Sequence, residues 1–177
     1  MAGQVLTPTP IPAASAIVLR DAPLEVLLLR RSEKSSFVPS AWVFPGGAIE
    51  ADESAEAAAV RETFEECGIV LDPKTLVLTS RWITPKGIPK RFDTWFFLAR
   101  VARDAAVRID GNEIVEAMWI APAEALRRKD LRLVFPTIKN LQAVAAFDSF
   151  DALAESRRGA RIEPVEPVLV DGKPVLR

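Results

Sequence analysis

Three glutamates in one short segment are the side chains best suited to chemistry in this sequence: Glu62, Glu65 and Glu66. Residues 54–67 are rich in Ala, Glu and Arg, which favour a helix, and Gly68 follows where a helix commonly ends. At 100° per residue, Glu66 falls about 40° to one side of Glu62 and Glu65 about 60° to the other. The three carboxylates therefore share one face of the predicted helix.

Such a grouping of acids predicts a bound cation. Neighbouring carboxylates repel and raise each other's pKa, and Mg²⁺ or Mn²⁺ relieves this best because both ions prefer oxygen ligands. The alternative is a solvated helix face without a ligand, the commoner reason for this spacing. On the opposite face we expect Ala57, Val60, Phe64 and Cys67 to be buried, so that the acidic face points away from the core.

Residue types that are absent or rare narrow the chemistry further. The sequence has no His, which excludes mechanisms that need an imidazole as base or zinc ligand, and a single Cys, which excludes an internal disulfide. Its formal charge of -1 provides no positive field for a nucleic acid polymer or an anionic membrane. No apolar run reaches the roughly 18 residues of a membrane span, and the first residues do not resemble a signal peptide. These features favour a soluble, cytoplasmic protein.

The 177 residues are expected to form one domain. Pro8, Pro10 and Pro12 predict a flexible lead-in over residues 1–12, ahead of a single domain over residues 13–177. The order of apolar runs, turns and helix-forming stretches predicts an α+β fold, with a mixed sheet packed by helices. Strands are predicted at 14–20, 24–30, 42–44, 76–84, 91–101 and 114–120, helices at 54–67, from Pro122, at 136–147 and at 151–157, and an edge strand or surface strap at 162–176.

A longer pattern decides between the metal and the solvated-face interpretations. Gly47, Glu53 and the run Arg61-Glu62-Thr63-Phe64-Glu65-Glu66-Cys67-Gly68-Ile69 have the spacing of the Nudix box, so the sequence resembles the Nudix hydrolase family. A chance match of this length is on the order of 10⁻⁸ per starting position. Thr63 departs from the pattern, because the family more often has a larger aliphatic residue there.

The resemblance implies a Nudix fold, an α/β/α sandwich around a mixed β-sheet. It also implies that water attacks the pyrophosphate of a nucleoside diphosphate linked to a moiety X, with Mg²⁺ or Mn²⁺ as cofactor. The partner would be a small nucleotide-type substrate, and dimers are common in the family. The implied metal ligands are Glu62, Glu65, Glu66 and the Gly47 carbonyl, and the implied orienting pair is Arg61 with Glu53.

Several acidic residues are candidates for the general base. In many members a glutamate of the box or an acid on a later loop serves, and Glu113 lies in the matching stretch here. Glu116 competes with it. Either residue is otherwise an exposed carboxylate at a loop or strand edge.

Candidate substrate contacts lie outside the box. Arg91 could hold a phosphate, Trp82 or Trp95 could stack on a base, and Arg30 is a further candidate. The alternative is that Arg91 pairs with Asp93 while the aromatic side chains fill the sandwich.

A narrower resemblance concerns the substrate. Residues 36–47, 82–85 and 91–94 are similar to the Nudix branch related to coenzyme A diphosphatases, which implies coenzyme A or an acyl-coenzyme A as substrate. Ser36 and Ser40 stand where that signature has Arg and Gly. The missing Arg removes an expected contact to the coenzyme A 3′-phosphate.

Two rival functions remain at this level. One is a Nudix module that binds a nucleotide derivative without cleaving it, although such domains tend to lose box carboxylates that this chain retains. The other is an isomerase of an isoprenoid diphosphate. It would need a well-placed catalytic Cys, whereas Cys67 is expected on the buried helix face.

Overall fold

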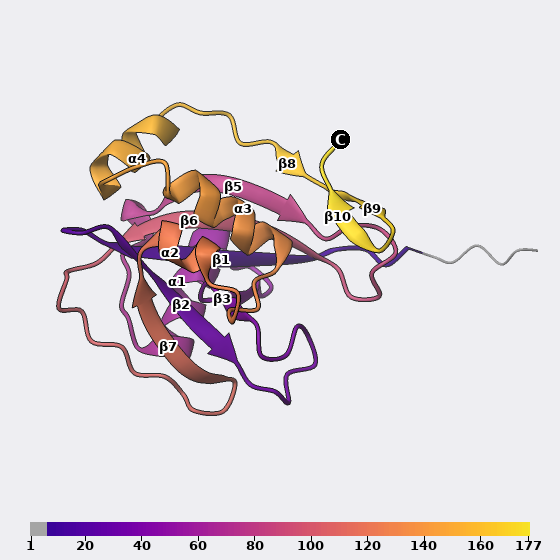
Figure 1. Ribbon diagram of the computed structural model, residues 1–177, viewed down its shortest axis with the longest axis horizontal. Helices are drawn as coiled ribbons and strands as arrows, with labels where there is room; N and C mark the ends of the chain where they lie inside the picture. The colour runs from indigo at the N-terminus through magenta and orange to yellow at the C-terminus, as the bar shows by residue number, and fades with distance from the viewer. Residues whose placement is uncertain (1–6) are drawn as a thin grey trace, which may run out of the picture.

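The protein is described by a computed structural model that covers residues 7–177 (Figure 1). Of the expected lead-in, residues 1–6 lie outside the described residues, and residues 7–10 have no regular secondary structure. Ile11 and Pro12 already belong to the first strand. The Ile11 N–H donates to the Arg91 carbonyl and the Pro12 carbonyl accepts from the Ile49 N–H, each at 2.9 Å. A proline fits here because a carbonyl, which proline retains, makes this bond.

The elements follow the expected order, except that residues 46–48 form a strand that was not expected. The strands are β1 (Ile11–Arg20), β2 (Glu25–Arg31), β3 (Trp42–Val43), β4 (Gly46–Ala48), β5 (Val77–Ile83), β6 (Phe92–Arg100), β7 (Ile114–Ile120), β8 (Pro164–Val165), β9 (Val168–Val170) and β10 (Lys173–Val175). The helices are α1 (Ala55–Cys67), α2 (Pro122–Arg127), α3 (Phe135–Val144) and α4 (Phe150–Arg157), with a 3₁₀ turn at Pro73–Thr75.

The main sheet is mixed and splits beside its central strand. Its order is β3-β2-β1-β6-β5-β8, with β1 parallel to β6 along its length. β1 pairs with β2 only next to their connecting turn, at Leu19 and Arg20. Farther along, β1 pairs with β4 instead, while β2 pairs with β3 and β7. The divergence of β1 and β2 leaves room for β4, which places Gly46 and Gly47 in the middle of the fold just before α1.

Helices cover both faces of the sheet, which confirms the expected α/β/α sandwich. Alternate residues of β1 supply two apolar clusters: Ile17 and Leu19 face one side, Ala16 and Val18 the other. The first cluster packs against α2, α3 and α4, and the second against α1. In Figure 1 the orange helices lie in front of the sheet and α1 lies behind it.

Helix α1 begins and ends where the sequence predicts, but the face that it buries differs from the predicted one. The Ser54 hydroxyl accepts from an N–H of the first turn, and Gly68 ends the helix with φ 72°. The expected burial of Phe64 is wrong, because this side chain is 57% exposed, whereas Glu66 is only 4% exposed. Small residues, among them Ala59, let the helix lie against β1 and β4. The acidic face therefore turns partly inward.

The tail forms an edge and a strap, as expected. β8 adds to the sheet as a parallel edge strand beside β5, and β9 and β10 form a separate antiparallel hairpin, drawn in yellow in Figure 1. Within residues 7–177, no helix has both the length and the apolar character that crossing a membrane requires.

Candidate active site

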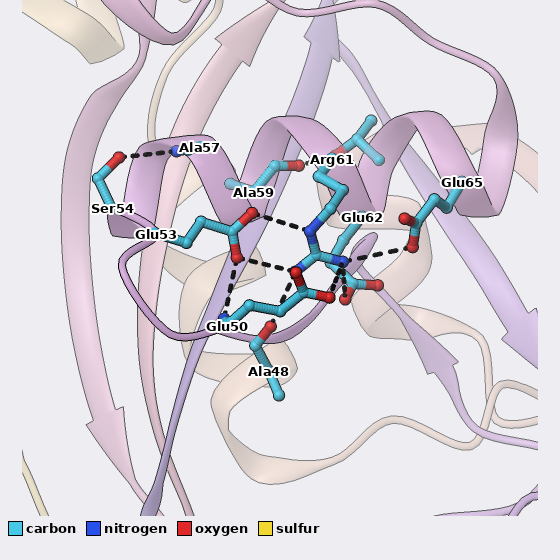
Figure 2. A network of polar contacts seen from close by, with 10 residues as sticks. Ala48, Glu50, Glu53, Ser54, Ala57, Ala59, Arg61, Glu62 and Glu65 are labelled. Carbon is cyan, nitrogen blue, oxygen red and sulfur yellow. Dashed lines mark hydrogen bonds and ion pairs between the residues drawn. The ribbon is translucent and has the colours of Figure 1, made fainter.

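Arg61, in the middle of α1, is the centre of an acidic network (Figure 2). Its Nε and Nη2 donate to the two carboxylate oxygens of Glu53 at 2.8 and 2.9 Å, a bidentate pair. Nη2 also donates to the Ala48 carbonyl of β4 at 3.0 Å. The Arg61 bonds, with help from the Glu50 N–H, lower the pKa of Glu53 to about 2. The network ties α1 to the loop and strand that precede it.

Glu62 and Glu65 share the remaining nitrogen of the same guanidinium. Arg61 Nη1 donates to Glu62 Oε1 at 2.8 Å and lies 3.4 Å from Glu65 Oε2. Burial raises the pKa of Glu62, although Arg61 acts in the opposite direction. The Glu62 side chain is 18% exposed and that of Glu65 is 55% exposed, so the pair runs from the interior of the site to solvent.

Glu66 is the buried member of the group. It accepts a hydrogen bond from the Gly46 N–H at 3.0 Å. Burial raises its pKa to about 8, against the effect of this bond, and the nearby charges of Glu62 and Glu113 add to the increase. A buried carboxylate in this state gains from a cation, because the cation offsets the cost of ionising it.

This burial predicts a pH dependence of stability. Between its unfolded pKa near 4.5 and its folded pKa near 8, Glu66 keeps its proton in the folded state and loses it in the unfolded state. The free energy of unfolding contributed by Glu66 therefore falls as pH rises from about 5 to 8. In metal-free protein, Glu66→Gln should raise the Tm at pH 8 by several degrees and leave it nearly unchanged at pH 5. Scanning calorimetry with EDTA measures this, with Glu65→Gln as the exposed control; equal effects of the two variants would contradict it.

Two glycines of β4 are required by close approach to their neighbours. A Cβ on Gly47 would lie 2.5 Å from Glu62 Cδ, and one on Gly46 would lie 2.5 Å from the Ala14 carbonyl and 2.7 Å from Ser15 Cα. The absence of a side chain at these two positions therefore permits both close approaches. Gly47 meets a movable carboxylate, whereas Gly46 meets backbone.

Substitution of Gly47 should impair catalysis, whereas substitution of Gly46 should impair folding. Gly47→Ala should fold but push the Glu62 carboxylate aside, lowering kcat/KM for a cleaved diphosphate at least about tenfold. Gly46→Ala should lower the Tm or prevent folding, because the backbone of β1 cannot yield. Steady-state kinetics and thermal unfolding of both variants test this contrast. Normal turnover by Gly47→Ala would contradict the role of Glu62.

Glu113 and Glu116 are placed differently by the structure. Glu113 precedes β7, is 60% exposed, lies 3.9 Å from Arg31 and raises the pKa of both Glu62 and Glu66. Glu116 lies opposite Arg30 in the β2–β7 ladder and accepts from Arg30 Nε at 2.8 Å. The fold therefore brings Glu113, and not Glu116, toward the acidic group.

The guanidinium of Arg91 is hydrogen-bonded to other residues of the chain. It is 5% exposed and donates to the carbonyls of Thr84 and Pro8 and, at 2.7 Å, to Glu166 of the tail. The suggested pairing of Arg91 with Asp93 is not found, because Asp93 accepts from Arg81. Arg91 thus joins the tail to the sheet.

The other three substrate candidates are also placed. Trp95 lies under the Arg81 guanidinium, whose carbon is 4.0 Å from the ring centroid, and Arg30 is paired with Glu116. Trp82 is 9% exposed and packs edge-on against Phe135, but it also lines a cavity. Of the four candidates, Trp82 is the one that borders this space.

The cavity has a volume of about 350 Å³ and adjoins the acidic network. Gly46, Gly47 and Arg31 line it together with Trp82 and apolar side chains. Arg31 was not expected to be functional: adjacent side chains of a strand point to opposite faces, and the sequence does not show whether Arg30 or Arg31 faces the site. The Ala48 carbonyl that accepts from Arg61 was also not predicted, because a residue of any type can supply a backbone carbonyl.

The donor set fits a hard divalent cation in chemical type. Carboxylate oxygens of Glu62, Glu65 and Glu66 occupy one region, and within the part of the chain that the structure describes the buried Glu66 has no positively charged hydrogen-bond partner. Among residues 7–177, however, no group of three acidic or cysteine side chains is already arranged to hold an ion. Arg61 Nη1 occupies the position between Glu62 and Glu65 instead.

Comparison with known proteins shows the family of the chain. A family model described as NUDIX domain matches residues 9–140, which is most of the chain. The chain belongs to the NUDIX family. A solved NUDIX hydrolase from Alicyclobacillus acidocaldarius is 25% identical, with a TM-score of 0.75, and the match covers 85% of this chain and 97% of that one. The NUDIX domain of Shewanella oneidensis NrtR, solved with ADP ribose, has a TM-score of 0.62 at 21% identity and a match covering 76% and 86% of the two chains, which shows the common fold.

Curated NUDIX relatives are similar over parts of their length. Putative nudix hydrolase 7 of Caenorhabditis elegans is 27% identical, with 64% of this chain and 52% of the relative covered. The m7GpppN-mRNA hydrolase NUDT17 of Danio rerio is 32% identical, with 59% and 40% covered. Phosphatase NudJ of Shigella boydii is 31% identical, with 58% and 67% covered. The chain thus spans about half of the first two of these relatives.

Proposed function

We propose that this NUDIX chain is a divalent-metal-dependent hydrolase that cleaves the pyrophosphate linkage of a nucleoside diphosphate derivative, NDP-X, into NMP and P-X. The observation that carries the proposal is the geometry of Glu62, Glu65 and Glu66, held by the Arg61–Glu53 pair beside Gly47, which lines the adjoining cavity. The names of the relatives, which include hydrolases and a phosphatase, support the same reaction class.

The metal would be held by Glu62, Glu65, Glu66 and the Gly47 carbonyl. When bound, Mg²⁺ or Mn²⁺ supplies charge neutralisation at the diphosphate and a lower pKa for the attacking water. The protein's own part is to keep the carboxylates oriented: Arg61, fixed by Glu53 and Ala48, sets the position of Glu62.

Two residues beside this group complete the proposed machinery. Glu113 is solvent-exposed and near Glu62 and Glu66, so it is suited to accept a proton from the attacking water. Arg31 lies at the same end of the cavity as Gly46 and Gly47, where it can stabilise the negative charge of the substrate's phosphates.

The alternatives are less well supported. Burial raises the pKa of the Cys67 thiol to about 11 and the thiol donates to the Thr63 carbonyl, so Cys67 is not suited to act as the catalytic residue of an isomerase. A module that binds without cleaving has no need for the acids that this site retains.

A substrate panel tests the proposal. Purified protein with Mg²⁺ or Mn²⁺ is offered coenzyme A, an acyl-coenzyme A, ADP-ribose, dinucleoside polyphosphates and nucleoside triphosphates, and products are resolved by mass. We expect metal-dependent release of a nucleoside monophosphate product from at least one of them. Cleavage of coenzyme A to a 3′,5′-bisphosphate would assign the narrower branch, despite the Ser at position 36. Binding without cleavage would favour the non-catalytic module.

A further inference from the structure

The cavity beside the acidic network is mostly apolar, and its polar side chains are Arg31 and the hydroxyls of Ser15, Thr84, Thr94 and Thr137. Its walls include Phe44, Phe92, Phe96 and Phe135, whereas Arg31, at the end with the β4 glycines, is the one charged side chain among the described residues that line it. A diphosphate placed against the glutamates would therefore direct one of its substituents away from charge and into the apolar part.

The tail of the chain closes one side of this cavity. Leu169 of β9 and Pro174 of β10 line it, and Leu169 Cδ1 would lie 3.4 Å from a Cβ placed on Gly87 in the β5–β6 turn. The ion pair between Arg91 and Glu166, at 2.7 Å with Arg91 buried, anchors the hairpin against the sheet. The apolar wall is thus held in place by a buried cation.

Trp82 adds a polar group to these walls. Its Nε1–H is buried and has no hydrogen-bond acceptor within residues 7–177. A buried donor without a partner is costly. Because Trp82 lines the cavity while its Nε1 has almost no accessible surface, a ligand oxygen reaches this donor once adjoining side chains of the wall move aside. The hydroxyl of Thr84, another lining residue, is already used, since it accepts from the Phe92 N–H at 3.0 Å.

The proportion of apolar to polar groups in the cavity walls favours some ligands over others. A purine or a sugar presents several donors and acceptors. Besides Trp82 and Arg31, the walls offer only the hydroxyls of Ser15, Thr94 and Thr137 to pair with them, and each group left unpaired carries a cost. An aliphatic group carrying one acceptor oxygen would bury its chain against the Phe side chains and satisfy Trp82.

We propose that this cavity binds the X moiety of the substrate and that X is aliphatic, with a carbonyl or ether oxygen that accepts from Trp82 Nε1. The proposal rests on the proposed diphosphate hydrolysis and specifies its substrate class. Trp82 and Leu169 then determine specificity, while the acidic network acts on the diphosphate common to all substrates.

A series of ADP esters tests this directly: methyl, octyl, and an ether-containing chain of octyl length, with ADP-ribose as the polar X. We expect kcat/KM to be at least about tenfold higher for octyl than for methyl or ribose. Leu169→Asp should remove most of this ratio, whereas Val170→Asp, at an exposed neighbour that does not line the cavity, should leave it unchanged. Trp82→Phe should reduce kcat/KM for the ether chain several-fold relative to the octyl chain, because the ring remains and the donor is lost.

The outcomes separate the two proposals. Equal rates for methyl and octyl esters, or a preference for ADP-ribose, would overturn the aliphatic assignment and leave the hydrolase intact. Calorimetric binding of the same esters provides a second measurement that does not depend on turnover. Tighter binding of octyl than methyl ester without any cleavage would support the cavity assignment and contradict the hydrolase, and equal binding would contradict the assignment.

Discussion

Glu65→Gln is expected to lower kcat for a cleaved diphosphate by about 10²- to 10⁴-fold while leaving the Tm within a degree or two of the wild type. The side chain is 55% exposed and its contact with Arg61 Nη1 is long, at 3.4 Å, so the folded state loses little. The active site, in contrast, loses one of the charges that would hold the metal. The expected result is a large catalytic defect in a protein of normal stability.

The matched control for this experiment is Glu56→Gln in the first turn of the same helix, outside the Arg61 network. Both variants are compared by steady-state kinetics over a range of Mg²⁺ and Mn²⁺ concentrations and by thermal unfolding. A catalytic defect shared by both variants would indicate a general effect of helix charge. Near-normal turnover by Glu65→Gln at limiting metal would exclude the metal assignment of this residue.

Arg61→Ala is expected to affect stability and activity together. It removes the bidentate partner of Glu53, the donor to Glu62 and the bond to the Ala48 carbonyl. Because Glu53 and Glu62 then lose their positive partner, the free energy of unfolding should fall, which is measured as a lower Tm. Without Arg61 the carboxylates lose their fixed positions, so kcat/KM should fall by at least about 10²-fold.

Arg61→Lys separates charge from geometry. Lysine keeps one positive charge but cannot form the forked pair with Glu53 while also bonding to Glu62 and Ala48. We expect most of the stability to return while most of the activity does not. Arg128→Ala provides the control, since Arg128 forms a similar fork with Asp130 on the surface, away from the network, and should change neither the Tm nor kcat. Full activity in Arg61→Lys would contradict the positioning role.

Much of the fold could be predicted from local sequence patterns. Alternation in β1 assigns Ile17 and Val18 to opposite faces, and Ser54 and Gly68 mark the ends of α1 because capping depends on adjacent backbone groups. The grouping of the glutamates on one helix face followed in the same way from helical periodicity. Helix caps and side-chain periodicity depend only on residues close together in the chain, so both can be predicted from the sequence.

The side of α1 that packs against the sheet and the partners of Arg91 could not be predicted by the same means. The periodicity of α1 grouped the glutamates but was wrong about the burial of Phe64, because the side that packs is set by β1 and β4 and by the hydrogen bond from Gly46 to Glu66. Arg91 likewise has the chemistry of a phosphate ligand. Its role as an anchor depends on Glu166, which is distant in the sequence.

Residue types and their spacing were enough to predict which side chains are available for chemistry: carboxylates without His, one Cys, and a spaced set of Gly, Glu and Arg residues that indicates the family. Three other features became evident in the folded chain: Arg31 rather than Arg30 lines the cavity, Glu113 rather than Glu116 approaches Glu66, and the tail closes the apolar wall beside Trp82. The physical reason is that residue type and local spacing are properties of one segment. Register between strands and the packing of a distant tail are set by contacts between segments, and these contacts exist only once the chain has folded.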